Sequence, residues 1–100
     1  MQAKLIMTWD IAPQHEQEYL EFVINEFMPG LEKIGFKLGD AWVTVYGEYP
    51  QILVYVYLPS LQEIRQAMQG DHWKDLYGRL MEYVVNYSHK VVPATSSFQF

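Results

Sequence analysis

Residues 41–58, AWVTVYGEYPQILVYVYL, contain two runs of strongly β-forming residues joined through a Gly-Glu-Tyr-Pro turn. Valine, isoleucine, threonine and aromatic residues suit a pleated, half-buried surface, and Gly47 with Pro50 marks the reversal between the two runs. The stretch therefore predicts a β-hairpin, around which the rest of the chain assembles.

The two faces of this hairpin differ in chemistry. If the strands pair about the 49/50 bond, Trp42 lies opposite Tyr57 on an aromatic face, and Val45 lies opposite Val54 on an aliphatic face. An antiparallel sheet with one face in water alternates apolar and polar residues, and these strands offer few polar ones. Both faces of the hairpin therefore require cover.

The composition indicates one globular domain over residues 1–100. Half of the residues are hydrophobic and 19% are charged, which is typical of a chain with its own core. Aromatic residues make up 16%, with eight tyrosines and three tryptophans. Side chains of that size must pack in a core, an interface or a ligand pocket.

The charge pattern argues against several partners. The formal net charge is −5, and the seven lysines and arginines are scattered singly, so no basic stripe exists to bind a nucleic acid. No cysteine is present, which removes disulfide and thiolate chemistry and fits a reducing compartment. No apolar run approaches the about 18 residues of a membrane span, so we expect a soluble, cytoplasmic protein without a membrane partner.

The first third of the chain predicts a strand followed by a helix. Residues 4–11 alternate in polarity like a half-buried strand. Pro13 suits the first turn of a helix, whose apolar positions then recur at helical spacing as far as Ile34. Pro29 is expected to kink or break this helix, and Gly35 is expected to end it in a left-handed cap.

The last third predicts a divided helix and a short strand. The sequence Ser60-Leu-Gln-Glu63 is a capping box that begins a helix, and Gly70-Asp71 interrupts it. The second helical piece carries an apolar stripe from Trp73 to Tyr87. Residues 96–100 alternate and predict the last strand.

This order of elements predicts an α+β fold with a four-stranded antiparallel sheet and its helices on one face. The helices cover only one of two apolar faces. Because ordinary monomers do not leave an apolar patch of several hundred Å² in water, we expect a homodimer in which two sheets pack face to face.

Three short segments carry a family resemblance: Gly35-Phe36-Lys37-Leu38, Asp71-His72-Trp73 and Asn86-Tyr87-Ser88. Together with the order and lengths of the elements, they make nearly the whole chain resemble the dimeric α/β-barrel superfamily, which has the ferredoxin-like βαββαβ topology. Within it, the NIPSNAP-like and antibiotic-biosynthesis-monooxygenase-like members are the most similar. The resemblance implies a pocket between sheet and helices. Some members bind haem, some oxidise or isomerise aromatic or lactone-like metabolites without a cofactor, and many have no known activity.

Histidines are the obvious proton carriers near neutral pH. His72 lies beside Trp73 at the edge of the predicted core face, where it could serve as a catalytic acid or base, or as a haem ligand. The alternative is a helix-start residue that is hydrogen-bonded locally or to water. Tyr77 is the second candidate catalytic residue, and His89 is a second candidate haem ligand, with plain solvent exposure as its alternative.

A set of large aromatic side chains could line a ligand pocket, stacking on an aromatic ligand and orienting it through their hydroxyls. The candidates are Trp9, Trp42, Tyr46, Tyr55, Tyr57, Trp73 and Tyr83. The alternative is that they fill the core or the dimer interface, and the sequence leaves open which face of the hairpin the helices cover.

Several familiar active-site motifs are missing from the sequence: His-Glu-x-x-His, Gly-x-Ser-x-Gly, a glycine-rich phosphate loop and paired cysteines. These absences argue against a zinc protease, an α/β serine hydrolase and a nucleotide-dependent enzyme, and no spacing predicts a metal site.

Three functional hypotheses follow. The first is a homodimer that binds a small hydrophobic or aromatic molecule, with cofactor-independent oxygenation or isomerisation through His72 and Tyr77 as its catalytic form. The second is a non-catalytic scaffold or ligand carrier. The third is a haem-binding protein.

Overall fold

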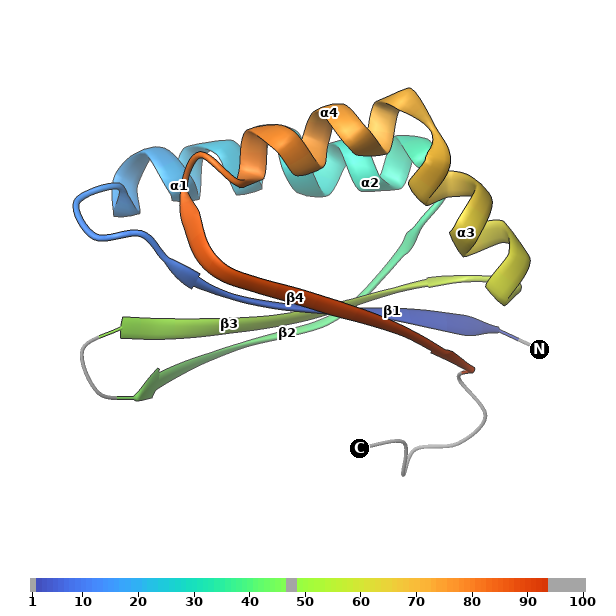
Figure 1. Ribbon diagram of the computed structural model, residues 1–100, viewed down its shortest axis with the longest axis horizontal. Coiled ribbons are helices and arrows are strands. Elements are labelled where there is room, and N and C mark those ends of the chain that lie inside the picture. The colour runs from blue at the N-terminus through green and yellow to red at the C-terminus, as the bar shows by residue number, and fades with distance from the viewer. Residues whose placement is uncertain (1, 47–48, 94–100) are drawn as a thin grey trace.

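The computed structural model describes residues 2–46 and 49–93, with the backbone alone for residues 42–46, 49 and 50. Its elements follow one another along the chain as shown in Figure 1. They are β1 (Ala3–Ile11), α1 (Glu16–Phe22), the π-helical turn η1 (Val23–Phe27), α2 (Met28–Ile34), β2 (Lys37–Tyr46), β3 (Tyr49–Leu58), α3 (Leu61–Gln69), α4 (Asp71–Leu80) and β4 (Val84–Pro93).

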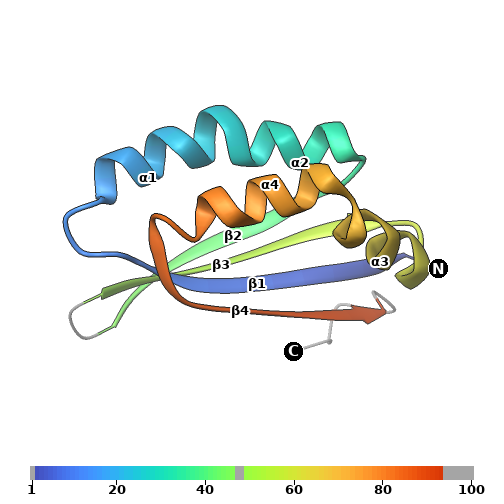
Figure 2. The same cartoon turned by 45° about the horizontal axis from the view of Figure 1, so that its top comes forward.

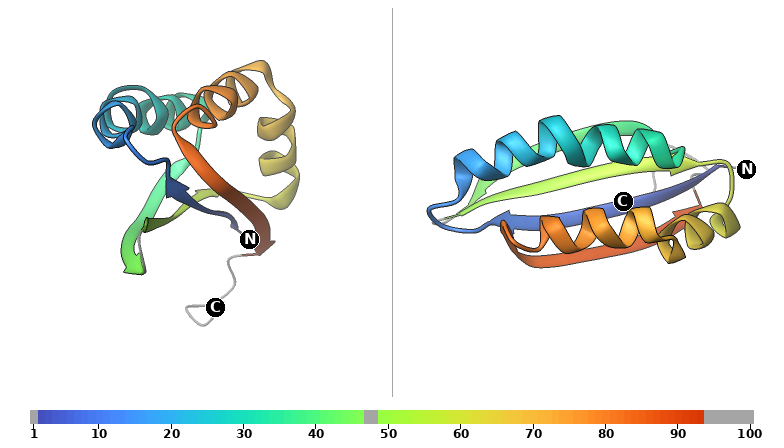
Figure 3. Two further views of the ribbon diagram at one scale, coloured as in Figure 1. Left: turned by 60° about the vertical axis from the view of Figure 1, so that its left-hand side comes forward. Right: turned by 90° about the horizontal axis from the view of Figure 1, so that it is seen from above.

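The strands form one four-stranded antiparallel sheet in the order β2-β3-β1-β4. The described helices all lie on one face of the sheet (Figures 1 and 2), and seen from above the α1–η1–α2 segment runs beside α4 across it (Figure 3). The predicted α+β, ferredoxin-like fold with its helices on one face is confirmed. None of the helices in the described ranges is long and apolar enough to cross a membrane.

The hairpin is present, but the predicted register was wrong by four residues. The pairing closes with Tyr46 opposite Tyr49, and Trp42 lies opposite Leu53 rather than Tyr57. Pro50 therefore belongs to the start of β3, a strand position where a residue without an N–H is tolerated. Because the shift is an even number of residues, the predicted division into two faces survives it.

The helices cover the aliphatic face of the hairpin. Ile52, Val54 and Val56 on β3 are buried in the core beneath the helices, whereas Tyr55 and Tyr57 alternate with them and lie on the opposite face. The structure thus decides which face of the hairpin the helices cover, which the sequence left open.

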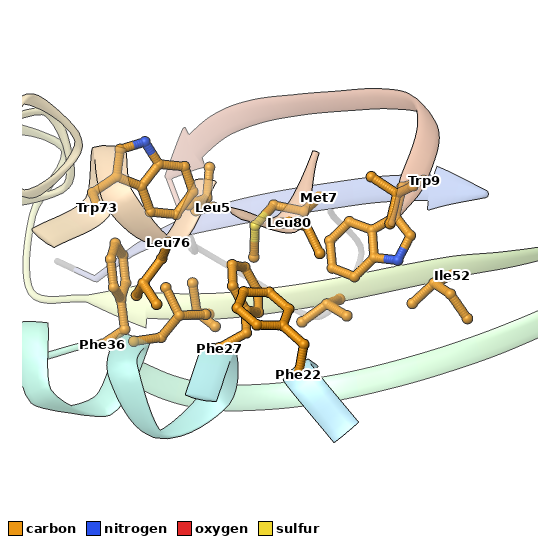
Figure 4. Close-up of a cluster of buried hydrophobic side chains, with 14 of the residues drawn as sticks. Leu5, Met7, Trp9, Phe22, Phe27, Phe36, Ile52, Trp73, Leu76 and Leu80 are labelled. Carbon is orange, nitrogen blue, oxygen red and sulfur yellow. The ribbon is translucent and has the colours of Figure 1, made fainter. Parts of the chain in front are cut away.

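The core fills the space between this face and the helices. Figure 4 shows Trp9 at one end and Trp73 with Phe36 at the other, with Met7 and Phe27 between them. The largest fully buried side chains are Trp9, Phe27, Leu5, Met7, Leu31, Ile64, Leu80 and Val56.

The first helical segment does not break at Pro29. Instead, the turn just before it widens into the π-helical η1, in which the Met28 N–H donates to the Val23 carbonyl five residues back. Pro29 supplies no N–H and crowds the carbonyl four residues before it, and the extra residue in the preceding turn accommodates that defect. Gly35, with φ 117°, ends the segment in the predicted left-handed cap.

The start of that segment differs slightly from the prediction. The helix begins at Glu16, so Pro13 lies in the turn that precedes it rather than in its first turn. Gln14, with φ 70°, reverses the chain there at a left-handed backbone position.

The second helical region is divided as predicted. The Glu63 N–H donates to Ser60 Oγ at 3.1 Å and caps the start of α3. Gly70 has an extended backbone and separates α3 from α4. It, rather than Asp71, occupies the N-cap position of α4.

The predicted end of the last helix was wrong. α4 stops at Leu80, and residues 84–93 form β4 rather than a continued helix. Val84 and Tyr87 match a helical spacing from Leu80, but this segment pairs with β1 at the start of the chain, from Ile11 opposite Val84 to Ala3 opposite Pro93. A local pattern cannot reveal that partner. The last strand predicted at 96–100 lies outside the described residues.

The contact between α2 and α4 at Gly30 gives a test of the packing. A Cβ added to Gly30 of α2 would lie 2.7 Å from Leu76 Cδ1 of α4, whereas one added to Gly78 would meet nothing within 4 Å. We expect Gly78→Ala to stabilise the protein by about 0.5–1 kcal/mol through helix propensity. The unfolding free energy of Gly30→Ala should be lower than that of Gly78→Ala by about 1–3 kcal/mol, because the added methyl group overpacks the contact with Leu76. Urea unfolding measures both, and equal stabilities would contradict this close packing.

Candidate functional site

An apolar cavity of about 390 Å³ lies between the first helical segment and the strands β1, β2 and β3. It opens to solvent along α1 and is lined almost entirely by apolar atoms. The described lining residues are Trp9, Ile11, Glu16, Tyr19, Leu20, Val23, Met28, Ala41, Ile52 and Val54. We call this space the α1 cavity.

The wall of the α1 cavity contains a buried hydrogen bond. Trp9 Nε1 of β1 donates to Tyr19 Oη of α1 at 2.8 Å, and the two rings meet edge to face with centroids 6.5 Å apart. The two residues are only 1% and 3% exposed. A buried indole N–H needs an acceptor, so this bond joins the sheet to the helix at the cavity wall.

The Tyr19 phenol is a poor proton carrier. Burial raises the pKa of Tyr19 to about 12, although the hydrogen bond from Trp9 lowers it in part. The phenol therefore stays neutral far above physiological pH.

The rim of the α1 cavity combines one carboxylate with exposed apolar residues. Glu16 is exposed and begins α1. Leu20, which also lines the cavity, lies one turn further along and is 52% exposed. Among the described lining residues, the helix side of the entrance is therefore apolar at Leu20 and carries one acidic group, Glu16.

A stack of aromatic rings runs from Trp9 away from the cavity. Trp9 stacks on Tyr87 of β4 with a centroid distance of 6.1 Å and an interplanar angle of 12°. Tyr87 meets Tyr77 edge to face at 5.1 Å, and Tyr77 in turn stacks on Trp73 at 6.1 Å. The structure thus joins three of the predicted site residues, Trp9, Trp73 and Tyr77, through Tyr87.

The phenol at the centre of this stack faces a histidine. Tyr87 Oη lies 3.0 Å from His89 Nδ1, and His89 is exposed at the sheet edge. Burial raises the pKa of the Tyr87 phenol, and the nearby Tyr77 adds to the rise. His89, the second candidate haem ligand, does not belong to the described lining of the α1 cavity.

His72 and Tyr77 face different surroundings. His72 is exposed and lines a groove of about 290 Å³ between α2 and α4, together with polar residues such as Lys33. Arg79, in the same groove, forms a salt bridge with Glu26. Neither His72 nor Tyr77 belongs to the described lining of the α1 cavity, and the structure does not bring the pair together there.

The other predicted aromatic residues are dispersed. Tyr83 is half-buried and packs on Phe22 at 5.4 Å. Tyr55 and Tyr57 lie edge to face at 6.3 Å on the sheet face opposite the helices. Trp42 and Tyr46 lie in β2, and their side chains are outside the described part of the chain.

The sequence reasoning missed most of the residues that line the α1 cavity. Glu16, Tyr19, Leu20 and Val23 stand at positions i, i+3, i+4 and i+7 and share one helical face. Tyr19 and Val23 belong to the helical spacing that predicts a core-facing stripe, whereas Glu16 and Leu20 are not part of that prediction. Their role as a cavity wall depends on how far the helix stands from the sheet, which no spacing reports.

The described residues contain no cluster of three or more histidine, aspartate or glutamate side chains that could hold a metal ion.

Comparisons with known proteins extend this description at the level of the fold. No family model matches the sequence, and no curated protein matches it. A solved NIPSNAP family protein from Agrobacterium tumefaciens is 19% identical, with 97% of this chain and 88% of that chain covered and a TM-score of 0.72. An ethyl tert-butyl ether d (ethd) family protein from Bacillus halodurans is 24% identical over 91% of this chain and 96% of that chain, with a TM-score of 0.61.

A third solved structure extends the range of the fold. A Nitrosomonas europaea protein that is provisionally named an antibiotic biosynthesis monooxygenase is 5% identical over 96% of this chain and 92% of that chain, with a TM-score of 0.66. The class is thus the ferredoxin-like α+β fold. Within that class, the chain shares its architecture with NIPSNAP and monooxygenase-like structures, so the resemblance expected from the sequence is confirmed in fold.

The buried hydrogen bond at the cavity wall can be tested by removing its acceptor. Tyr19→Phe leaves the Trp9 N–H buried without a partner, so we expect a loss of about 1–3 kcal/mol of unfolding free energy. Tyr77→Phe is the matched control, because the structure gives the Tyr77 hydroxyl no hydrogen-bond partner among the described residues. We expect Tyr77→Phe to lower the unfolding free energy by about 0.5 kcal/mol or less. Urea denaturation measures both, and equal costs would contradict the assignment.

Proposed function

We propose that the protein binds a small hydrophobic molecule in the α1 cavity. The observation that carries the proposal is the cavity itself, about 390 Å³ in volume, open to solvent and lined almost entirely by apolar atoms. Ligand sites in proteins are concave, mostly apolar and about 300–1,000 Å³ in volume, so this one lies within the range.

The size of the α1 cavity supports a ligand rather than accidental loose packing. Protein interiors are packed as densely as organic crystals and hold few voids larger than a water molecule. Here Trp9, Ile52 and Val54 are buried, yet they border a space much larger than that. An apolar molecule in this space would gain the dispersion contacts that its walls lack.

The chemistry of the lining favours binding over turnover. A general base must lie within hydrogen-bond reach of the proton that it abstracts. The described lining offers one carboxylate, Glu16 at the rim, and one neutral phenol, Tyr19, whose oxygen already accepts from Trp9. We therefore favour a ligand carrier or sensor over the oxygenase and isomerase hypotheses that invoke His72 and Tyr77.

The homodimer remains part of the proposal. Within the described ranges, the helices cover one face of the sheet, and the other face carries the half-buried side chains of Leu53 and Tyr57. Lys4 on that face is 4% exposed, with its ammonium 4.7 Å from the centre of the Tyr55 ring. Lys4 is thus already covered within one chain, and the half-buried Leu53 and Tyr57 are the residues that leave apolar surface for a second sheet to cover.

A homologous series of ligands tests the proposed cavity. From hexan-1-ol to decan-1-ol, each added methylene should strengthen binding about fourfold, since burying one CH₂ gives about 0.8 kcal/mol. The gain should stop once the chain outgrows the cavity. Isothermal titration calorimetry measures the series.

A blocking variant and its control complete this test. Ala41→Trp places a large ring in the cavity from β2 and should abolish the chain-length dependence. Leu38→Trp adds the same ring to the same strand at a position outside the described lining, so it should leave binding unchanged. Binding that is insensitive to chain length, or equally lost in both variants, would sink the proposal.

The homodimer has a separate test. We expect native mass spectrometry of the wild-type protein to show a dimer. Leu53→Lys, on the sheet face away from the helices, should shift the protein to a folded monomer. Leu20→Lys introduces the same change on the helical layer and should stay dimeric. A wild-type monomer, or a folded Leu53→Lys variant that remains a dimer, would contradict this assembly.

A further inference from the structure

This inference rests on the proposed function, and it concerns the chemical class of the ligand. We propose that the α1 cavity selects molecules with an apolar body and an uncharged or cationic polar end, and that Glu16 at the rim disfavours anionic ones such as fatty acids.

The charges around the cavity carry the argument. Among its described lining residues, Glu16 is the one charged side chain, and neither lysine, arginine nor histidine contributes to the lining. Tyr19 stays neutral because burial raises its pKa to about 12. A carboxylate ligand entering the cavity would therefore find a like charge at the rim and no counter-charge on the described walls.

A competing effect comes from the helix that Glu16 begins. The first turn of a helix presents unpaired N–H groups and a partial positive charge, which favour an anion. Here Glu16 and Glu18 both lie in that first turn and already offset its charge. The full negative charge of Glu16, the charged residue of the described lining, by itself outweighs about half a positive charge, so the rim is net negative.

The nearest histidine does not reverse this balance. His15 precedes Glu16, but its Nδ1 lies 3.7 Å from Glu18 Oε2, and the pair is exposed. The chain as a whole carries a formal net charge of −5, which adds to the repulsion of an anion at low salt.

The size of the expected preference follows from Coulomb's law. Two like unit charges about 5 Å apart in water lower an affinity about fourfold, and two opposite charges raise it by a similar factor. A cationic ligand should therefore bind roughly 15-fold more tightly than an anionic ligand of equal length, and an uncharged one should fall between them. The ratio should shrink as salt is added.

Three ligands of one chain length provide the probes: decylammonium, decan-1-ol and decanoate, each below its micelle concentration, at pH 7.5 and low salt. Calorimetric titration of the wild-type protein should give affinities in that order. Glu16→Gln should bring the two charged ligands to within about threefold of each other, and Glu16→Lys should place decanoate above decylammonium.

Glu18→Lys is the matched control. It changes the net charge by the same amount as Glu16→Lys and lies in the same helical turn, but Glu18 does not belong to the described lining. The wild-type order of ligands should persist in Glu18→Lys.

The outcomes separate this inference from the proposed function. If decan-1-ol fails to bind, the cavity is not a ligand site and both ideas fall. If decan-1-ol binds while decanoate matches decylammonium, the selection by Glu16 is wrong and the cavity stands. If Glu18→Lys reorders the ligands as Glu16→Lys does, the effect is one of net charge, and the local role of Glu16 is overturned.

Discussion

The hydrogen bond from Trp9 to Tyr19 links the sheet to the first helix at the wall of the α1 cavity. Trp9 belongs to a central strand and Tyr19 to the first helix, and their 2.8 Å contact is buried. A buried indole N–H needs a hydrogen-bond acceptor. If the first helix moved relative to the sheet, the Trp9 N–H would lose Tyr19 as its acceptor, at a cost in free energy. The same indole stacks on Tyr87 of the edge strand, so one side chain ties together a helix and two strands.

The α1 cavity beside that bond is a space that the core side chains leave unfilled. The opposite end of the core is tight: Gly30 lets Leu76 approach so closely that a single methyl group has no room. A protein that packs one end of its core this densely and leaves about 390 Å³ open at the other has a structural asymmetry. We interpret that asymmetry as a binding site, and its almost wholly apolar walls account for the choice of a hydrophobic ligand.

The candidate site shows which site residues local sequence patterns can predict and which they cannot. Trp9 was predicted as a ligand-lining residue and lines the cavity, but the other described wall residues were assigned to the core or left aside. His72 was selected because it falls beside Trp73 on a helical stripe, and the structure places it in the groove between two helices. Helical spacing reports which side chains share a face, whereas the presence of a cavity depends on the distance between layers. That distance is set by contacts between residues far apart in the sequence.

The sequence by itself determined the elements whose causes are local. These include the hairpin strands, the division of their faces, the left-handed end of the first helix at Gly35 and the Ser60 cap of α3. The tertiary structure decided the rest: the register of the hairpin, the face that the helices cover, the strand at residues 84–93 and the cavity. Tyr87 fits a helical stripe and a strand equally well by periodicity. Only pairing with β1, which supplies backbone hydrogen bonds from the other end of the chain, selects the strand.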